Sequence, residues 1–337
     1  MNPLVSVLMS VHNEDLGYID CAVKSICDQT YKNIEFIIID DASDLYVYRH
    51  LLELSEKYNI IKLYRNEANL GLTKTLNNGL RMVNGEYIAR MDADDFSCPN
   101  RIATQVDYLY KNKDIDIVGT GVVSFGDRYS YMSMMNGANN DEVQCYLFFS
   151  SSLCHPSVMI RKSFLERTGL CYDDNVKKAQ DYELWERASV EGKLAVIKDV
   201  LLYYRLHPNQ ITSKSSKEQI LTASNIRLRR LRRLSIDPTD REILCHKALL
   251  GQKVSVDMGE VKYWIEKIVN ASRSISYIDS EHFAKHLNRR YILFKMKCRK
   301  KLNIKELPIA LSIIFSRILM QIRLKRFISI IPNIVKS

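Results

Sequence analysis

The stretch Gly85-Glu-Tyr-Ile-Ala-Arg-Met-Asp-Ala-Asp-Asp95 decides how this chain folds, because an apolar, strand-like run ends there in closely spaced carboxylates. Asp92, Asp94 and Asp95 would repel one another, unless a cation supplies the larger local charge. Oxygen ligands of this kind favour Mg2+ or Mn2+, and such an ion keeps open positions for phosphate groups. The alternative is an Asp-rich turn that caps a helix opened by Pro99.

Strands and helices alternate on both sides of this stretch. Val5–Met9 and Ile34–Ile39 are apolar runs interrupted only by Ser6 and Glu35, with a helical pattern between them, as in a parallel βαβ unit whose strands are covered on both faces. Further strands are expected over Ile60–Tyr64, Tyr87–Met91 and Ile115–Phe125, and helices over Val47–Tyr58, Leu72–Val83 and Pro99–Lys111. Beyond Phe125 the rhythm breaks, with a short strand at Ser157–Ile160 and a helix over Asp181–Val190. The sequence predicts an α/β fold with a Rossmann-like, mostly parallel sheet and flanking helices.

Polar segments follow three of the predicted strands, at Ser10–Glu14, Asp40–Asp44 and Asp92–Asp95. In open α/β sheets, ligands bind beyond the carboxyl ends of the strands. We therefore expect the three segments to converge on one edge of the sheet. This convergence favours a site for a metal and a nucleotide over an isolated Asp-rich turn.

The 337 residues divide into two parts of opposite charge. Residues 1–213 carry 22 Lys and Arg against 29 Asp and Glu, a net charge of −7, and residues 214–337 carry 27 against 10, a net charge of +17. We expect an α/β domain over residues 1–213 and a basic, mostly helical region over residues 214–337. The acidic part argues against a nucleic-acid partner. The basic part suits anionic lipid headgroups, with nucleic acid as the alternative for any basic segment.

Cysteine spacing and hydrophobicity favour a cytoplasmic protein. The eight cysteines form no Cys-x-x-Cys pair and no Cys/His finger spacing. The run Leu4–Val11 has no basic segment before it and no cleavage site after it, so we interpret it as a strand rather than a signal peptide. The longest apolar stretch, Leu307–Phe315, is shorter than the roughly 20 residues that a membrane-spanning helix needs.

Six ordered motifs resemble the family 2 glycosyltransferases of GT-A fold, over roughly residues 3–212, and in particular the bacterial enzymes of O-antigen and capsule synthesis. The motifs are Val5–Glu14, Ser25–Tyr31, Ile37–Ser43, Asn69–Gly71, Gly85–Asp95 and Gln180–Trp185. The resemblance implies an inverting, metal-dependent transfer of a hexose, galactose or glucose, from a UDP-sugar. The implied acceptor is a lipid-linked glycan of the GlcNAc-diphospho-undecaprenol type, joined by a β-linkage. His12 and Ser10 depart from the family pattern, which usually has Tyr or Phe, and Pro or Thr, at these places.

The resemblance also implies roles for the matched residues. Asp181 would be the catalytic base, Asp41 would bind the uracil ring, and Asp94 would be the principal ligand of Mn2+ or Mg2+. Asp92 and His207, the latter in Tyr204–Thr212, would complete the metal site. The expected nucleotide-sugar-binding residues are Ser10, His12, Asn13, Glu14, Asp41, Asn69, Gly71, Lys74, Arg90, Asp92 and Ala93.

Several of these residues have structural alternatives. Asp181 suits a helix N-cap, His207 a loop before Pro208, and Lys74 an exposed helix surface. Arg90 either braces the carboxylates after its strand or is an ordinary residue at a strand end. His155 would line the acceptor pocket or be a buried structural side chain.

Two other functions use similar parts. A sugar nucleotidyltransferase would also have an α/β sheet with acidic metal ligands, but it would need a Gly-rich basic loop after the first strand, and Ser10–Glu14 has neither glycine nor lysine. A non-catalytic nucleotide-sugar-binding module would be expected to lack Asp94 or Asp181. The basic, apolar segment Pro308–Ile331 predicts peripheral association with the inner face of the plasma membrane. The donor sugar, the linkage position and the oligomeric state stay open.

Overall fold

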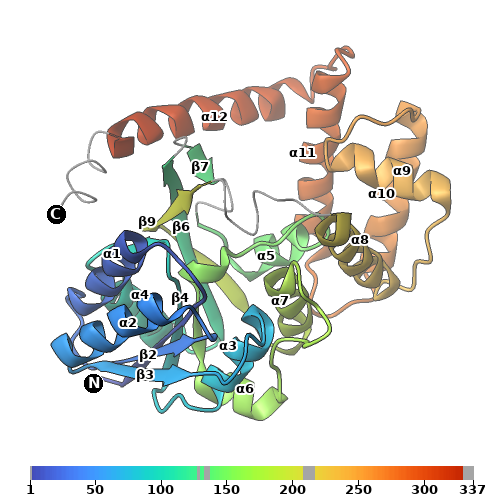
Figure 1. Ribbon diagram of the computed structural model, residues 1–337. Coiled ribbons are helices and arrows are strands. Elements are labelled where there is room, and N and C mark those ends of the chain that lie inside the picture. The colour runs from blue at the N-terminus through green and yellow to red at the C-terminus, as the bar shows by residue number, and fades with distance from the viewer. Residues whose placement is uncertain (1, 127–129, 133–136, 208–216, 329–337) are drawn as a thin grey trace. The chain divides into compact units, whose positions relative to one another are not determined.

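The computed structural model describes residues 2–126, 130–132, 137–207 and 217–328, which form two compact units (Figure 1). The first unit comprises Met1–Asn139 and Ser151–Thr222, and the second comprises Asn140–Ser150 and Ala223–Ile330. The domain boundary predicted at residues 213 and 214 lies outside the described residues, as does the end of the predicted segment Pro308–Ile331.

A nine-stranded sheet organises the described part of the first unit, in the order β3-β2-β1-β4-β8-β6-β9-β5, with β7 paired to β6. Neighbours pair in parallel from β3 to β4 and between β6 and β9, whereas β5, β7 and β8 are antiparallel to their partners. The predicted mostly parallel sheet is therefore confirmed. The strands are β1 (Val5–Val11), β2 (Ile34–Asp40), β3 (Ile61–Arg65), β4 (Tyr87–Asp92), β5 (Phe96–Ser97), β6 (Ile117–Gly126), β7 (Ser130–Met132), β8 (Met159–Arg161) and β9 (Leu194–Leu206).

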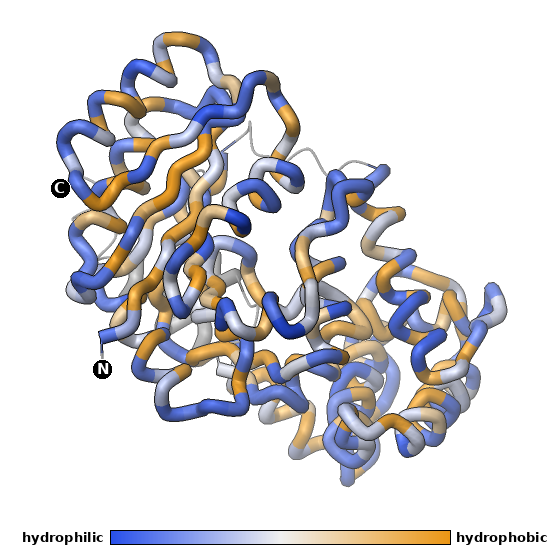
Figure 2. Tube along the Cα trace, turned by 90° about the horizontal axis from the view of Figure 1, so that it is seen from below, coloured by the Kyte–Doolittle hydropathy of each residue, from blue (hydrophilic) through white to orange (hydrophobic). Residues whose placement is uncertain are grey.

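Helices cover the sheet, and its central strands β1 and β2 are buried along almost their whole length (Figure 2). Helix α3 approaches β1 closely at Gly79, where an added Cβ would lie 2.3 Å from the Leu8 Cδ1 atom. A larger residue at this position would force the Leu8 side chain to move. The helices of this unit are α1 (Leu16–Cys27), α2 (Leu45–Lys57), α3 (Leu72–Leu80), α4 (Arg101–Lys111), α6 (Lys162–Thr168) and α7 (Gln180–Glu191), with a 3-10 turn over His155–Ser157.

The strand register brings the predicted polar segments to one edge of the sheet. Val11 pairs with Asp40, and Ser10 pairs with Asp92, so β1, β2 and β4 end together. The short strand β5 then pairs with β9, with Phe96 opposite Tyr203. This pairing carries the chain after Asp92 to the end of β9.

The second unit is helical and has its own hydrophobic core. Trp264 and Phe283 are fully buried in it, together with Phe148 and Phe149. The sequence prediction placed Asn140–Ser150 in the first domain. In the structure this segment clusters with the second unit, because its aromatic side chains are part of this core. The helices are α5 (Asn140–Tyr146), α9 (Asp240–Leu249), α10 (Met258–Ser272), α11 (Ser280–Lys297) and α12 (Leu307–Ile328), while α8 (Lys217–Arg232) begins before the unit boundary.

None of the helices described combines the length and the hydrophobicity that a membrane crossing would require.

Candidate active site

Three carboxylates meet at the end of β4. One oxygen each of Asp92, Asp94 and Asp95 lies within 4.8 Å of the others. Asp95 is fully buried: its Oδ1 accepts a 2.8 Å hydrogen bond from the Arg205 backbone N–H, and no described residue donates to its Oδ2. Burial raises the pKa of Asp95 well above its ordinary value, and the charges of Asp94 and Asp92 add to this shift. A divalent cation would reverse this repulsion, so the donor atoms fit such an ion.

Asp94 also belongs to a second group of potential ligands. One ligand atom each of Glu14, Asp94 and His207 lies within 4.8 Å of the others, and His207 Nε2 is 3.1 Å from Asp94 Oδ2. The side chains of His207 and Asp94 are only 10% and 15% exposed. Burial raises the pKa of the Glu14 carboxyl, and the charge of Asp94 raises it further. Oxygen ligands with one imidazole suit Mn2+ or Mg2+.

Arg90 braces the acidic loop, as one of the two sequence interpretations expected. Its buried guanidinium donates to Asp92 Oδ1 and forms an ion pair with that carboxylate. Arg101, also fully buried, donates a 2.6 Å hydrogen bond from Nη2 to the Arg90 carbonyl. Burial lowers the pKa of Arg101 to about 10, so it remains charged at neutral pH. The two arginines hold the end of β4 in place.

Arg205 is a residue of the site that the sequence reasoning missed. Its Nε donates a 2.7 Å hydrogen bond to the Asp94 carbonyl, and its backbone N–H binds Asp95. The guanidinium lies 4.2 Å from the ring centre of Tyr18 and 4.5 Å from that of Phe125. In an extended strand, residues two positions apart point to the same side. Arg205 lies two positions before the predicted metal ligand His207, and this spacing could have indicated its place in the site.

Asp41 holds the loop that follows β3. Its Oδ1 accepts hydrogen bonds of 2.8 Å from Asn66 Nδ2 and from the Leu70 N–H, and its Oδ2 accepts one of 2.9 Å from the Gly71 N–H. A carboxylate offers about four acceptor positions, so one position on Oδ2 remains. The contact with uracil stays a prediction, and it would use that position.

His12 and Asn69 form one hydrogen-bonded chain with this loop. Asn69 Oδ1 accepts from the Gly71 N–H at 3.0 Å, and Asn69 Nδ2 lies 2.8 Å from His12 Nε2. His12 Nε2 is therefore the acceptor, and Nδ1–H donates to the Asp41 carbonyl at 2.9 Å. The structure brings together the predicted residues His12, Asp41, Asn69 and Gly71.

The other predicted nucleotide-binding residues lie in different environments. Asn13, at a φ of 50°, accepts a 2.7 Å hydrogen bond from the Asp44 N–H and so joins the ends of β1 and β2. Ser10 pairs with Asp92 in the sheet, and Ala93 is buried. Lys74 is exposed on α3. Direct contacts of these residues with a nucleotide stay predictions.

Asp181 is the second residue of α7. The N-cap of this helix is Ala179, at a φ of 56°, so the alternative that Asp181 is the N-cap is wrong. Ser151 Oγ donates to Asp181 Oδ2 at 3.4 Å. Burial raises the pKa of Asp181 to about 6, and the charge of Asp92 acts in the same direction. A carboxylate with this pKa is ionised at neutral pH and is still basic enough to accept a proton.

His155 lies in the core. It is 8% exposed, and its Nε2 is 2.7 Å from the Tyr172 hydroxyl. Burial lowers the pKa of His155 well below its ordinary value, so the ring is neutral. These contacts agree with the alternative of a buried structural side chain.

Comparisons with known proteins agree with this geometry. The model of the family described as Glycosyl transferase family 2 matches residues 6–169. The chain is 33% identical over 218 residues to the O-antigen biosynthesis glycosyltransferase WbnJ of Escherichia coli, an alignment that covers 63% of this chain and 83% of that protein. The chain therefore belongs to glycosyltransferase family 2.

Two solved structures share the fold at low sequence identity. The crystal structure of S. aureus TarS 1-349 in complex with UDP-GlcNAc has a TM-score of 0.59 at 16% identity, covering 89% of this chain and 93% of that one. The mannosyltransferase PcManGT from Pyrobaculum calidifontis, in complex with GDP-Man and Mn2+, has a TM-score of 0.51 at 15% identity, covering 99% and 85%. These similarities confirm the predicted GT-A fold.

Proposed function

We propose that this glycosyltransferase moves a hexose from a UDP-sugar to an acceptor hydroxyl with inversion, and that Asp181 is the base. The proposal rests on the clustered carboxylates of Asp92, Asp94 and Asp95 and on Asp181, whose pKa burial raises to about 6 and whose charge interacts with that of Asp92. A group of the right basicity therefore lies near the acidic loop.

A divalent ion, Mn2+ or Mg2+, would be held by Asp94, with Asp92 and His207, and Glu14 adds a fourth donor within reach. The fit rests on the clustered ligand atoms and on the buried Asp95 oxygen that no described residue binds. PcManGT, which shares the fold, contains Mn2+ in its complex. When bound, the ion would neutralise charge that develops on the leaving diphosphate.

The residues of the chain divide the remaining work. Asp181 takes the proton from the acceptor hydroxyl as its oxygen attacks the anomeric carbon, and the bond from that carbon to the diphosphate oxygen breaks. Attack from the face opposite the leaving group turns an α-linked donor into a β-linked product. The loop tied by Asp41, His12 and Asn69 holds the base of the nucleotide, while Arg90 keeps Asp92 oriented toward the donor.

The resemblance and the comparisons support the proposed donor and acceptor classes. TarS binds UDP-GlcNAc in its crystal structure, and the name of WbnJ places it in O-antigen biosynthesis. We accordingly propose a UDP-hexose donor, galactose or glucose, and an acceptor of the GlcNAc-diphospho-undecaprenol type. The product would belong to a bacterial surface polysaccharide, O-antigen or capsule.

The test is a transfer assay of the purified protein with Mn2+, a panel of UDP-sugars and a synthetic GlcNAc-diphosphate-lipid. We expect metal-dependent transfer from one donor, and loss of transfer in Asp94→Asn and Asp181→Asn. Glu191→Gln is the matched control, because Glu191 is exposed at the far end of the helix that carries Asp181. The absence of UDP release with every donor would overturn the proposed donor class. Full activity in Asp181→Asn would overturn the proposed base.

A further inference from the structure

Helix α12 contacts its own unit through one narrow face. Ala310 and Ile313 are 4% and 3% exposed, and they pack with the buried Ile292 of α11. Partly buried apolar side chains, among them Ile309 and Met296, complete this small core. One side of the first half of α12 is therefore covered.

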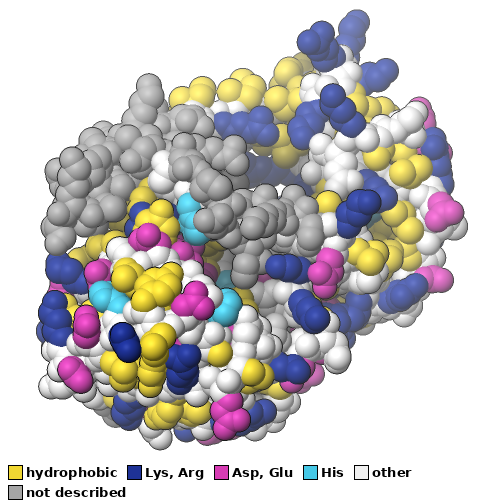
Figure 3. Space-filling view, in the orientation of Figure 1, with side chains coloured by type: hydrophobic (Ala, Val, Ile, Leu, Met, Phe, Trp, Pro, Cys, Tyr) yellow, Lys and Arg dark blue, Asp and Glu magenta, His cyan; other side chains and the backbone are white. Residues whose placement is uncertain are grey.

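The opposite side of the same helix is also apolar, and it is exposed. The exposed side chains are Leu307 (45%), Leu311 (64%), Ile314 (43%), Phe315 (61%), Ile318 (51%) and Leu319 (40%). Their spacing along α12 places them in one stripe, roughly 18 Å long at a rise of about 1.5 Å per residue. Figure 3 shows hydrophobic side chains along α12, whose position Figure 1 gives. A contiguous exposed apolar stripe of this length is typical of an interaction site, so this stripe indicates a binding surface.

Basic residues gather at the beginning of the stripe. Between Lys295 and Leu319 the chain has seven Lys and Arg and one acidic residue, Glu306, a net charge of +6. Arg299, Lys300, Lys301 and Lys305 are exposed, and Ile304 between them is 83% exposed. No described residue forms a hydrogen bond or ion pair with these four side chains. The exposed surface therefore combines uncompensated positive charge with apolar side chains.

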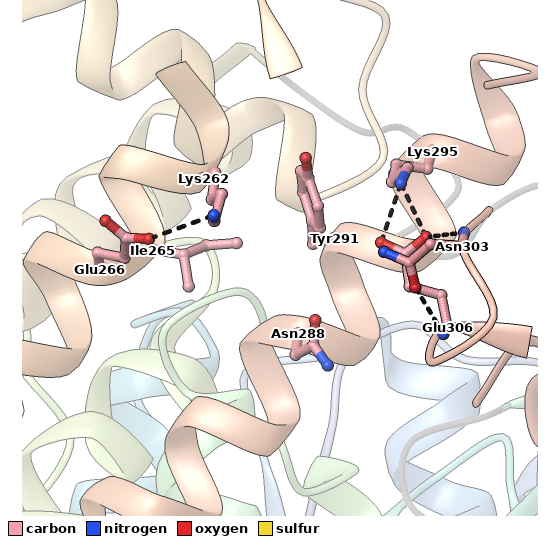
Figure 4. A pocket seen from close by; sticks show the side chains of 8 residues that line it. All are labelled: Lys262, Ile265, Glu266, Asn288, Tyr291, Lys295, Asn303 and Glu306. Carbon is pink, nitrogen blue, oxygen red and sulfur yellow. Dashed lines mark hydrogen bonds and ion pairs between the residues drawn. The ribbon is translucent and has the colours of Figure 1, made fainter. Parts of the chain in front are cut away.

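A network of polar contacts fixes the basic loop to the start of α12 (Figure 4). Lys295 Nζ lies 2.8 Å from Glu306 Oε2. Glu306, the one acidic residue between Lys295 and Leu319, is therefore paired with Lys295. The Asn303 N–H donates to Glu306 Oε2 at 2.8 Å, and the Glu306 N–H donates to Asn303 Oδ1 at 3.0 Å. These reciprocal bonds close the turn that precedes α12, so the basic loop and the start of the helix keep a defined arrangement.

We propose that this surface, which we call the α12 face, docks on an anionic lipid bilayer. It consists of the six exposed apolar residues of α12 together with Arg299, Lys300, Lys301, Ile304 and Lys305. Apolar side chains next to an excess of Lys and Arg are the signature of a helix that lies in the membrane interface, and anionic headgroups complement the charge. A docked α12 face would bring the enzyme to a lipid-linked acceptor, but the proposal itself does not depend on which sugar or acceptor is used.

The experiment is sedimentation of the full-length protein with phosphatidylcholine vesicles, with and without phosphatidylglycerol. We expect binding to the anionic vesicles that weakens as salt is raised. The double variant Phe315→Ser/Ile318→Ser tests the apolar part, and Lys300→Glu/Lys301→Glu tests the charge. Each should weaken binding by at least about tenfold. Controls are Tyr263→Ser, an aromatic residue 66% exposed on α10, and the charge reversals Lys253→Glu/Lys285→Glu, all of which should bind like the original protein.

Three results would overturn the proposal. One is the absence of binding to anionic vesicles by the original protein. A second is binding that both charge-reversal pairs weaken equally while Phe315→Ser/Ile318→Ser has no effect, because the attraction would then be nonspecific. The third is a dimer in light scattering that Phe315→Ser/Ile318→Ser dissociates, which would make the α12 face a contact between copies. Circular dichroism of each variant is the check that it folds, and UDP release in vesicle-free buffer tests the proposed transfer chemistry separately.

Discussion

Replacing Asp181 by Asn separates a catalytic role from a structural one, because the two roles predict opposite changes in stability. Burial raises the pKa of this carboxyl from 3.8 to about 6. The protonated form is therefore favoured in the folded state, and its contribution to stability is complete below about pH 4 and lost as the pH rises through about 6. A shift of about two pKa units corresponds to at most about 3 kcal/mol at pH 8.

Asn has nearly the same shape as Asp but carries no charge. Its carbonyl oxygen can still accept the hydrogen bond from Ser151. We expect Asp181→Asn to raise the free energy of unfolding by about 1–3 kcal/mol at pH 8 and to leave it nearly unchanged at pH 4. At the same time kcat should fall by about 10²–10⁴, the contribution typical of a positioned base.

The measurements are urea unfolding at both pH values and steady-state transfer with saturating donor and metal. Glu191→Gln, on the same helix, should change neither quantity appreciably. A less stable Asp181→Asn protein at pH 8 would show that the carboxylate is structural. A kcat within a few-fold of the original would refute the reasoning about the base.

Three further predictions concern the same site. The kcat of the original protein should rise with pH, with a midpoint near pH 6, and should level off above it, because Asp181 acts in its ionised form. A kcat that falls between pH 5 and 7 would contradict this role of Asp181. Arg205→Met should weaken Mn2+ binding by about 10–100-fold in calorimetric titration, because Arg205 positions the Asp94 loop, with kcat at saturating Mn2+ much less affected. Unchanged Mn2+ affinity would limit Arg205 to packing against Tyr18 and Phe125. Asp41→Asn should raise the KM for the donor by about tenfold with little change in kcat, because an amide cannot accept all three hydrogen bonds from Asn66, Leu70 and Gly71. A changed kcat with constant KM would argue against a role of Asp41 in donor binding.

The first half of the sheet could be predicted from the sequence because its strands are long, apolar and separated by helices. The alternation of apolar strands and helices can be recognised from neighbouring residues, and strands joined by helices pair in parallel. Strand β8 (Met159–Arg161) was expected only as a short strand, and nothing in its few residues says that it would insert antiparallel between β4 and β6. Strand β5 has two residues and was missed, because so short a segment carries no period.

The same limit applies to the site. Asp92, Asp94 and Asp181 could be proposed as site residues from the sequence because they lie in motifs of adjacent residues. Arg205 acts on the acidic loop through the pairing of β5 with β9, a contact across more than a hundred positions of the chain. Such a contact depends on the register of two strands, which the sequence of neither strand specifies alone.

Several aspartates lie around the site, and the contacts of each carboxylate indicate a different role. Asp41 accepts three hydrogen bonds from one loop and so serves as an anchor for that loop. Asp95 accepts one bond from the Arg205 N–H, has an oxygen that no described residue binds, and lies between other carboxylates, an arrangement that suits a cation. Asp181 has backbone donors at a helix start and one longer bond from Ser151, and burial outweighs them in setting its pKa. We propose proton transfer by Asp181 because its pKa is raised to about 6 and it lies outside both the loop anchor and the metal-donor cluster.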